Sequence, residues 1–173
     1  MQTLIESTLH QFKKQNQYLM ELSQVLNHLI KDRSLCNTNI TQELFLDYIG
    51  KVKTHIDAEE KVLYSSLLLH EQSKVKNTAL MFLAGSQEVN RIFSRYSKRW
   101  CKNPELRLKK HARFVAETEE MFELIHRRIQ SEKEKLYPLI ERNTKRKTKE
   151  EYQYYQNPTS TQSPTPVKSV AYS

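Results

Sequence analysis

The sequence predicts an all-α protein with the architecture of an up-down-up-down four-helix bundle. Four long segments carry apolar residues at spacings of three, four and seven, the period of an amphipathic helix, and short polar connections separate them. The 173 residues include only 2 glycines and 5 prolines, too little turn chemistry for a sheet protein. We expect one bundle over residues 1–144 and a separate tail over residues 145–173.

The first two predicted helices span residues 3–32 and 40–71. The connection between them is polar, and Asn39 with Gln42 is expected to cap the second helix. The inward side of the second helix is expected to include ionisable residues among the apolar ones. These inward positions are Phe45, Tyr48, Ile49, Val52, His55, Ile56, Glu59 and Leu63.

The third predicted helix covers residues 74–100, and the fourth follows a clear start signal. Asn103, Pro104 and Glu105 supply a capping side chain, a proline at the first helical position and an acid in the first turn. Pro138 is expected to kink or end the fourth helix, because proline has no N–H to donate. The expected core positions of the third helix are Val75, Ala79, Phe82, Ser86, Val89, Phe93, Tyr96 and Trp100.

The tail differs in composition from the bundle. It begins with charged residues and continues over residues 157–173 with many Ser, Thr and Pro, so it holds too little apolar surface to offset the entropy of ordering. The chain has a net charge of +8, of which residues 142–173 contribute +4. We therefore predict a disordered, basic tail. Binding of nucleic acid by this tail is a less favoured hypothesis than a solvated surface.

Several signals that define other classes of protein are missing. No run of 18 apolar residues occurs, and the N-terminus lacks the charged and apolar regions of a signal peptide. We therefore expect no membrane contact, a cytoplasmic protein, and reduced thiols at Cys36 and Cys101. No Gly-rich phosphate loop, CxxC pair or nucleophile elbow occurs, so we expect no enzymatic activity.

One motif occurs twice, on the second and on the fourth predicted helix. The first copy is His55-Ile-Asp-Ala-Glu59-Glu-Lys-Val-Leu-Tyr, and the second is Arg128-Ile-Gln-Ser-Glu132-Lys-Glu-Lys-Leu-Tyr. In both copies a basic residue precedes a glutamate by four positions, which places the two side chains on one helix face. Such pairs, projecting inward from facing helices, can hold a metal centre in a four-helix bundle.

The second copy changes the chemistry of the predicted site. Arg128 stands where a ligand would be, and arginine cannot coordinate a metal because its guanidinium stays protonated. We favour a metal-free structural core of His55, Glu59, Arg128 and Glu132, without a cofactor, in which Arg128 pairs with Glu132 or Glu59. The alternative is one iron or manganese ion on His55, Glu59 and Glu132, a set of ligands that suits either metal.

The remaining histidines are not expected to join this group. By helical periodicity His10 and His28 share a polar face, and His70 and His126 lie at the edges of apolar stripes. His111 faces inward, but it lies about 25 Å along the helix from the second copy of the motif. We expect His111 to be a hydrogen-bonded core histidine.

The two copies resemble the motifs of the hemerythrin-like, cation-binding family. The resemblance rests on His55-Ile-x-x-Glu59 in the first copy and on Glu132, with Leu-Tyr-Pro-Leu-Ile-Glu after it, in the second. In that family a histidine on each of four helices, with bridging carboxylates, holds two irons. The resemblance implies ligand roles for His55, Glu59 and Glu132, whereas Arg128 and Ser86 stand where two of the histidines belong. A di-iron centre is therefore not expected.

The chain also resembles the Rsd/AlgQ family of anti-sigma regulators, which are metal-free bundles with a similar repeat. The matching residues are His55 with Glu59 or Glu60, and Arg128-Ile-x-x-Glu132. This resemblance implies binding to the primary sigma factor of RNA polymerase.

We favour a non-enzymatic regulatory protein that binds another protein, with an anti-sigma-like regulator of transcription as the specific expectation. Tyr18, Phe45 and Trp100 are the candidate aromatic anchors for such a partner. The alternative function is that of a hemerythrin-like, non-heme iron protein that senses oxygen, nitric oxide or redox stress. The sequence indicates no oligomeric state.

Overall fold

The computed structural model of the chain describes residues 2–102 and 104–143, and every regular element within these ranges is a helix. The predicted all-α class is therefore confirmed. The elements in chain order are α1 (Gln2–Lys31), α2 (Arg33–Cys36), α3 (Asn39–Ala58), η1 (Glu59–Tyr64), α4 (Ser65–Leu68), α5 (Ser73–Trp100), α6 (Pro104–Lys109), α7 (His111–Ser131) and η2 (Glu132–Leu136).

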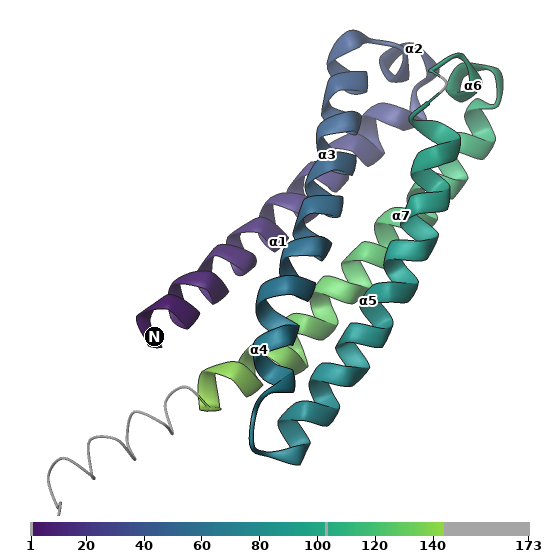
Figure 1. Cartoon of the computed structure of the whole chain (residues 1–173). Coiled ribbons are helices and arrows are strands. Elements are labelled where there is room, and N and C mark those ends of the chain that lie inside the picture. Colours follow the sequence, from purple (N-terminus) through teal and green to yellow (C-terminus); the bar gives the residue numbers. More distant parts are fainter. Residues whose placement is uncertain (1, 103, 144–173) are drawn as a thin grey trace, which may run out of the picture.

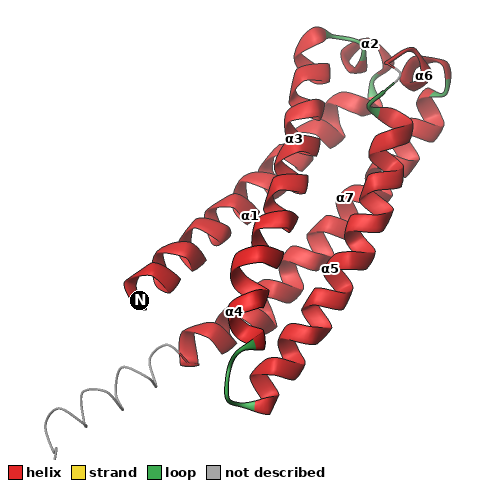
Figure 2. Cartoon of the chain, viewed as in Figure 1, coloured by secondary structure: helices red, strands yellow, loops and turns green. Residues whose placement is uncertain are grey.

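The long helices form the predicted up-down-up-down bundle. In Figure 1, α1, α3, α5 and α7 lie side by side and alternate in direction. The short helices α2 and α6 close one end of the bundle, and the connection from α4 to α5 lies at the opposite end, where α1 begins. The loops that join these elements are short, as the green segments of Figure 2 show. The predicted tail, residues 145–173, lies outside the described residues.

The caps of the helices differ from the prediction at the start of α3. Thr38, not Asn39, is the N-cap residue, and its hydroxyl oxygen accepts a hydrogen bond from the N–H of Thr41 at 3.3 Å. Thr38 suits this position because its backbone is extended, whereas Asn39 already belongs to the helix. The predicted partner Gln42 donates to the carbonyl of Asn37 instead, at 3.3 Å.

The fourth predicted helix is divided into α6 and α7 by Lys110, whose backbone leaves the helical region with φ −119° and ψ 42°. Arg107 of α6 is buried next to this break. It donates to the carbonyl of Trp100 at 2.8 Å and lies over the ring of Phe45. The short helix α6 thus fastens the end of the bundle, and the predicted capping residue Asn103 lies outside the described residues.

The helix does not end at Pro138. Residues 137–143 continue in helical conformation directly after the π-helical segment η2. At the end of η2 the backbone N–H of the C-cap residue Tyr137 donates to the carbonyl of Glu132, five residues before it. This wider turn stands where proline would otherwise interrupt the regular α-helical bonds, which is why the helix passes through Pro138.

The core has two apolar parts. One part surrounds Trp100, Phe45 and Phe114, and the other surrounds Phe12, Leu136 and their neighbours. The predicted stripe of the third helix is confirmed, because α5 buries all eight expected positions, Val75, Ala79, Phe82, Ser86, Val89, Phe93, Tyr96 and Trp100.

Burial also decides between the three predicted surface anchors. Phe45 and Trp100 are 2% and 1% exposed and belong to the core, so of the three only Tyr18, at 43%, reaches the surface. Cys36 and Cys101 are free thiols. Over the residues that the structure describes, no helix combines the length and the apolar character that a membrane span requires.

Candidate metal centre

Two π-helical segments begin at the two glutamates of the repeated motif. η1 starts at Glu59 and η2 starts at Glu132, each directly after a regular α-helix. Because π-helical bonds join residues five apart, the turn is wider than in an α-helix. This wider turn directs the side chains of Tyr64 and Tyr137 toward the glutamates five residues before them. Such turns are frequent at functional sites.

The two glutamates meet in the interior of the bundle, between the two apolar parts of the core. Glu59 is 2% exposed and Glu132 is fully buried. The hydroxyl of Tyr64 lies 3.4 Å from Glu59 and 3.5 Å from Glu132, and the hydroxyl of Tyr137 lies 3.2 Å and 3.5 Å from the same two residues. Burial raises the pKa of both tyrosines, so their hydroxyls stay protonated and donate.

His55 of α3 presents a free ring nitrogen to this pair. Its Nδ1 bonds to the amide oxygen of Gln15 at 2.9 Å, and because that oxygen can only accept, the hydrogen lies on Nδ1. In the neutral ring the lone pair then lies on Nε2. Nε2 is buried, lies 3.4 Å from Oε1 of Glu59 and has no hydrogen-bond partner among the described residues.

The three predicted ligands converge. One ligand atom from each of His55, Glu59 and Glu132 lies within 4.8 Å of the other two. Among the residues that the structure describes, no other three histidine, cysteine or acidic side chains converge in this way. The donor set, one imidazole and two carboxylates, suits iron or manganese.

Arg128 lies beside this group and pairs with Glu132, one of its two predicted partners. Its Nε donates to Oε1 of Glu132, its Nη2 donates to the hydroxyl of Tyr64, and its Nη1 donates to the carbonyl of Phe82 at 2.9 Å. The guanidinium also packs on the ring of Phe82, 4.9 Å from its centroid. Gly85 of α5 leaves room for it, since a Cβ at Gly85 would lie 3.1 Å from Nη1.

Asn16 completes the group from α1. It is 4% exposed, and its Nδ2 donates to the hydroxyl of Tyr137 at 2.6 Å and to Oε2 of Glu132 at 3.3 Å. The carbonyl oxygen of the same side chain is buried and has no hydrogen-bond partner among the described residues. Asn16 therefore connects α1 to the second copy of the motif and retains a free acceptor.

The charges within this group do not balance. Two carboxylates face one permanent cation, the Arg128 guanidinium. Burial, together with the neighbouring Glu59 carboxylate, raises the pKa of the Glu132 carboxyl to about 7, although Arg128 opposes this shift. The pair of carboxylates therefore retains a proton near neutral pH or accepts a cation in its place.

The other histidines lie apart from the group, as predicted. His10 and His28 are exposed. His111 is half-buried and bonds through Nε2 to the carbonyl of Ile30 at 2.7 Å. His126 is half-buried and bonds to the hydroxyl of Ser23 at 2.6 Å, so it connects two helices and is not the surface residue that was predicted. His70 follows α4.

Sequence patterns did not predict Gln15, Asn16 or Gly85 as parts of the site. The histidines of the first helix lie on its polar face, and the only sequence signal for Asn16 is a polar residue between the buried positions Phe12 and Leu19. For Gly85 the signal is a glycine inside a helical pattern, which generally has a packing reason.

The chain matches the model of the hemerythrin HHE cation binding domain over residues 7–140. The match covers most of the sequence, so the chain belongs to the hemerythrin HHE cation-binding domain family. Comparisons with curated proteins and with solved structures found no match.

These findings correct the expectation that the protein has no cofactor. That expectation is wrong because the family is a cation-binding one and because His55, Glu59 and Glu132 place their ligand atoms together. Arg128 does not replace the metal for both carboxylates, because its ion pair is with Glu132, whereas Glu59 faces His55. The resemblance to Rsd/AlgQ anti-sigma regulators has no support in the comparisons.

Proposed function

We propose that the chain binds one iron or manganese ion through His55, Glu59 and Glu132 and acts as a hemerythrin-like sensor of oxygen, nitric oxide or redox stress. The observation that carries this proposal is the buried Nε2 of His55, which has no hydrogen-bond partner among the described residues and faces the carboxylates. A buried polar atom left unpaired costs about 1–3 kcal/mol. A cation at this point offsets that cost and the unpaired carboxylate charge together.

The surrounding side chains support the ligands. Gln15 fixes the ring orientation and the tautomer of His55, in the manner of the outer partners of metal-bound histidines. Tyr64 and Tyr137 donate to the carboxylates and hold them in place. Bound iron would supply redox chemistry and coordination positions for small ligands, which are the properties that a sensor needs.

One ion, rather than two, follows from the second copy of the motif. Arg128 occupies the position that corresponds to His55, and its guanidinium already engages Oε1 of Glu132. A second cation would face this fixed charge at short range in a buried site, where repulsion is strong.

Membership of the family supports binding of a cation, and the sensing role is the part of the proposal that goes beyond this membership. The absence of enzymatic activity, the cytoplasmic location and a sigma-factor partner stay predictions.

Metal analysis tests the proposal. The protein is purified after growth in iron-supplemented medium, and metal content is measured by mass spectrometry for the wild type, His55→Ala and His111→Ala. We expect about one equivalent of iron or manganese, lost in His55→Ala because a ligand is removed and kept in His111→Ala because that ring bonds to Ile30 instead. Absence of metal, or an equal content in His55→Ala, would contradict the proposal. Two equivalents would contradict the role given to Arg128.

A further inference from the structure

We infer that a small protic ligand, of which water is the simplest, reaches the metal through the groove between α1 and the continuous helix of α7 and η2. Asn16 binds this ligand at the floor of the groove. The inference rests on the proposed metal site.

The groove has a charged rim and a polar floor. Its rim includes Lys13, Gln17 and Glu141, of which Lys13 and Glu141 form an ion pair across the groove. Its floor includes Asn16 and Tyr137, which are 4% and 2% exposed. The floor of this groove is therefore formed by side chains that touch the carboxylates of the site.

The floor carries donors and one free acceptor. The hydroxyl of Tyr137 lies 3.2 Å from Oε1 of Glu59, and Nδ2 of Asn16 lies 3.3 Å from Oε2 of Glu132. The carbonyl oxygen of Asn16 has no hydrogen-bond partner within the described ranges. A free acceptor next to the ligand atoms suits a ligand that donates a hydrogen bond, as water or hydroxide does.

Charge favours the same class of ligand. Two carboxylates, the Arg128 guanidinium and a divalent metal together leave one positive charge in a buried site. A small ligand that could lose a proton on binding, as water can, would neutralise that charge.

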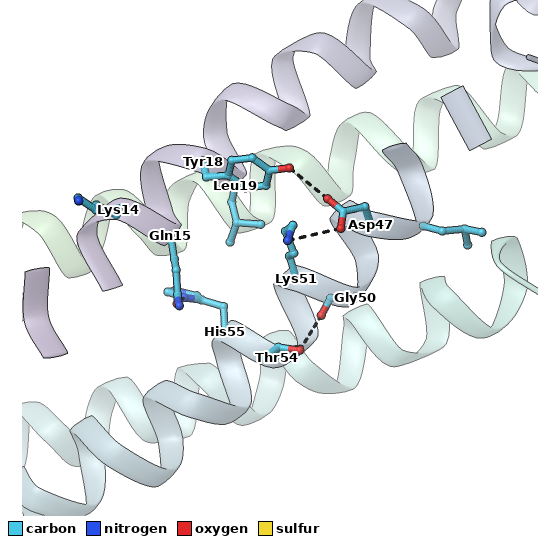
Figure 3. A pocket seen from close by; sticks show the side chains of 10 residues that line it. Lys14, Gln15, Tyr18, Leu19, Asp47, Gly50, Lys51, Thr54 and His55 are labelled. Carbon is cyan, nitrogen blue, oxygen red and sulfur yellow. Dashed lines mark hydrogen bonds and ion pairs between the residues drawn. The ribbon is translucent and has the colours of Figure 1, made fainter. Parts of the chain in front are cut away.

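A second groove, between α1 and α3, reaches His55 on the side of its ring that faces away from the carboxylates. In Figure 3 its inner end is formed by Gln15 and His55, which lie next to each other, while Tyr18, Asp47 and Lys51 form a bonded cluster farther along. The contact to Gln15 uses Nδ1 of His55, the nitrogen that faces away from the carboxylates. Neither glutamate lines either groove, but the floor of the first groove contacts both glutamates, whereas the second groove reaches only His55, so the second groove offers a matched control.

Water exchange at bound Mn²⁺ tests the inference. Metal-free protein is loaded with one equivalent of Mn²⁺, and the relaxation rate of solvent protons is measured, because Mn²⁺ enhances it when exchanging water reaches the ion. Gln17→Trp places an indole at the exposed rim of the first groove. Gly50→Trp fills the second groove, and its Cβ meets nothing within 4 Å.

We expect enhancement in the wild type, a decrease of about twofold or more in Gln17→Trp, and no change in Gly50→Trp. Asn16→Leu should also lower the enhancement while Mn²⁺ content stays near one equivalent. Loss in Gly50→Trp but not in Gln17→Trp, or no enhancement in a wild type that holds Mn²⁺, would overturn the inference. If the protein fails to bind Mn²⁺, the electron paramagnetic resonance signal of the free ion stays unchanged on adding protein. That result would contradict the proposed function itself, and the inference with it.

Discussion

Arg128 is the residue that distinguishes the two copies of the motif. Its guanidinium donates to Glu132, to the hydroxyl of Tyr64 and to the carbonyl of Phe82, and its side chain is 13% exposed. A cation held this firmly serves as a fixed counter-charge for a buried carboxylate. Losing it leaves that carboxylate without a partner, a costly arrangement in a low-dielectric interior.

For metal-free protein in chelator, we therefore expect Arg128→Met to lower the free energy of unfolding by about 3–5 kcal/mol. Adding Glu132→Gln should restore much of this loss, because the unpaired charge is removed as well. Denaturant unfolding of the two single variants and the double variant measures the coupling. A negligible loss in Arg128→Met would show that the pair does not balance charge in the core.

The two glycines of the chain offer a matched comparison. A Cβ at Gly85 would lie 3.1 Å from Nη1 of Arg128, which is fixed by its partners, whereas a Cβ at Gly50 meets nothing within 4 Å. Gly50→Ala should stabilise by about 0.5–1 kcal/mol, since alanine has the higher helix propensity. Gly85→Ala should instead destabilise by about 1 kcal/mol, because the guanidinium has to move.

Thermal and denaturant unfolding of both variants check this expectation. In an Arg128→Met background the crowding atom is gone, so Gly85→Ala should then stabilise as Gly50→Ala does. Equal effects of the two substitutions in the wild-type background would contradict a close fit between Gly85 and Arg128.

At the scale of elements, each copy of the motif contains a π-helical segment that interrupts the regular α-helix. η1 begins at Glu59 and η2 at Glu132, and each brings a tyrosine onto the side of its glutamate. The second segment is followed by Pro138, and the corresponding position after the first is Ser65. The hydroxyl of Ser65 donates to the carbonyl of Glu60, five residues before it, at 3.1 Å.

The correspondence predicts that Ser65→Pro is tolerated. We expect a loss of about 1 kcal/mol, one backbone hydrogen bond, because a proline already follows the equivalent turn. Thr54→Pro, at an exposed position inside α3, should cost about 3 kcal/mol or more, since it breaks regular helical bonding. Denaturant unfolding compares the two variants. A cost in Ser65→Pro as large as in Thr54→Pro would mean that the two π-helical segments are not equivalent.

At the scale of the whole molecule, the buried carboxylate pair links stability to pH. Burial and Glu59 raise the pKa of Glu132 to about 7 in the folded protein, from an ordinary value of 4.5. The folded state thus binds a proton that the unfolded state releases between these values. The stabilisation is complete below about pH 4.5 and is lost as the pH rises through about 7.

Metal-free protein should therefore lose about 3 kcal/mol of unfolding free energy between pH 4.5 and pH 8. Glu132→Gln, which has no carboxyl to ionise at this position, should lack most of this loss. Urea unfolding in chelator across this range measures both. Stability that is constant or rises with pH in the wild type, relative to Glu132→Gln, would contradict the prediction.

The helical pattern of the sequence determined the fold class, the alternation of four long helices and the eight buried positions of α5, because burial of an apolar stripe follows directly from periodicity. The repeated spacing of four residues also determined that His55, Glu59 and Glu132 would converge, because facing helices bring equivalent positions together.

Only the tertiary structure decided the rest of the site. The π-helical turns, the choice of Glu132 as the partner of Arg128, the room left by Gly85 and the place of Asn16 depend on contacts between residues far apart in the chain. No local pattern encodes such contacts, since a buried asparagine or a helical glycine looks the same in sequence whatever faces it. The unpaired nitrogen of His55 is the clearest case, because its free lone pair is visible only once Gln15 has taken the other side of the ring.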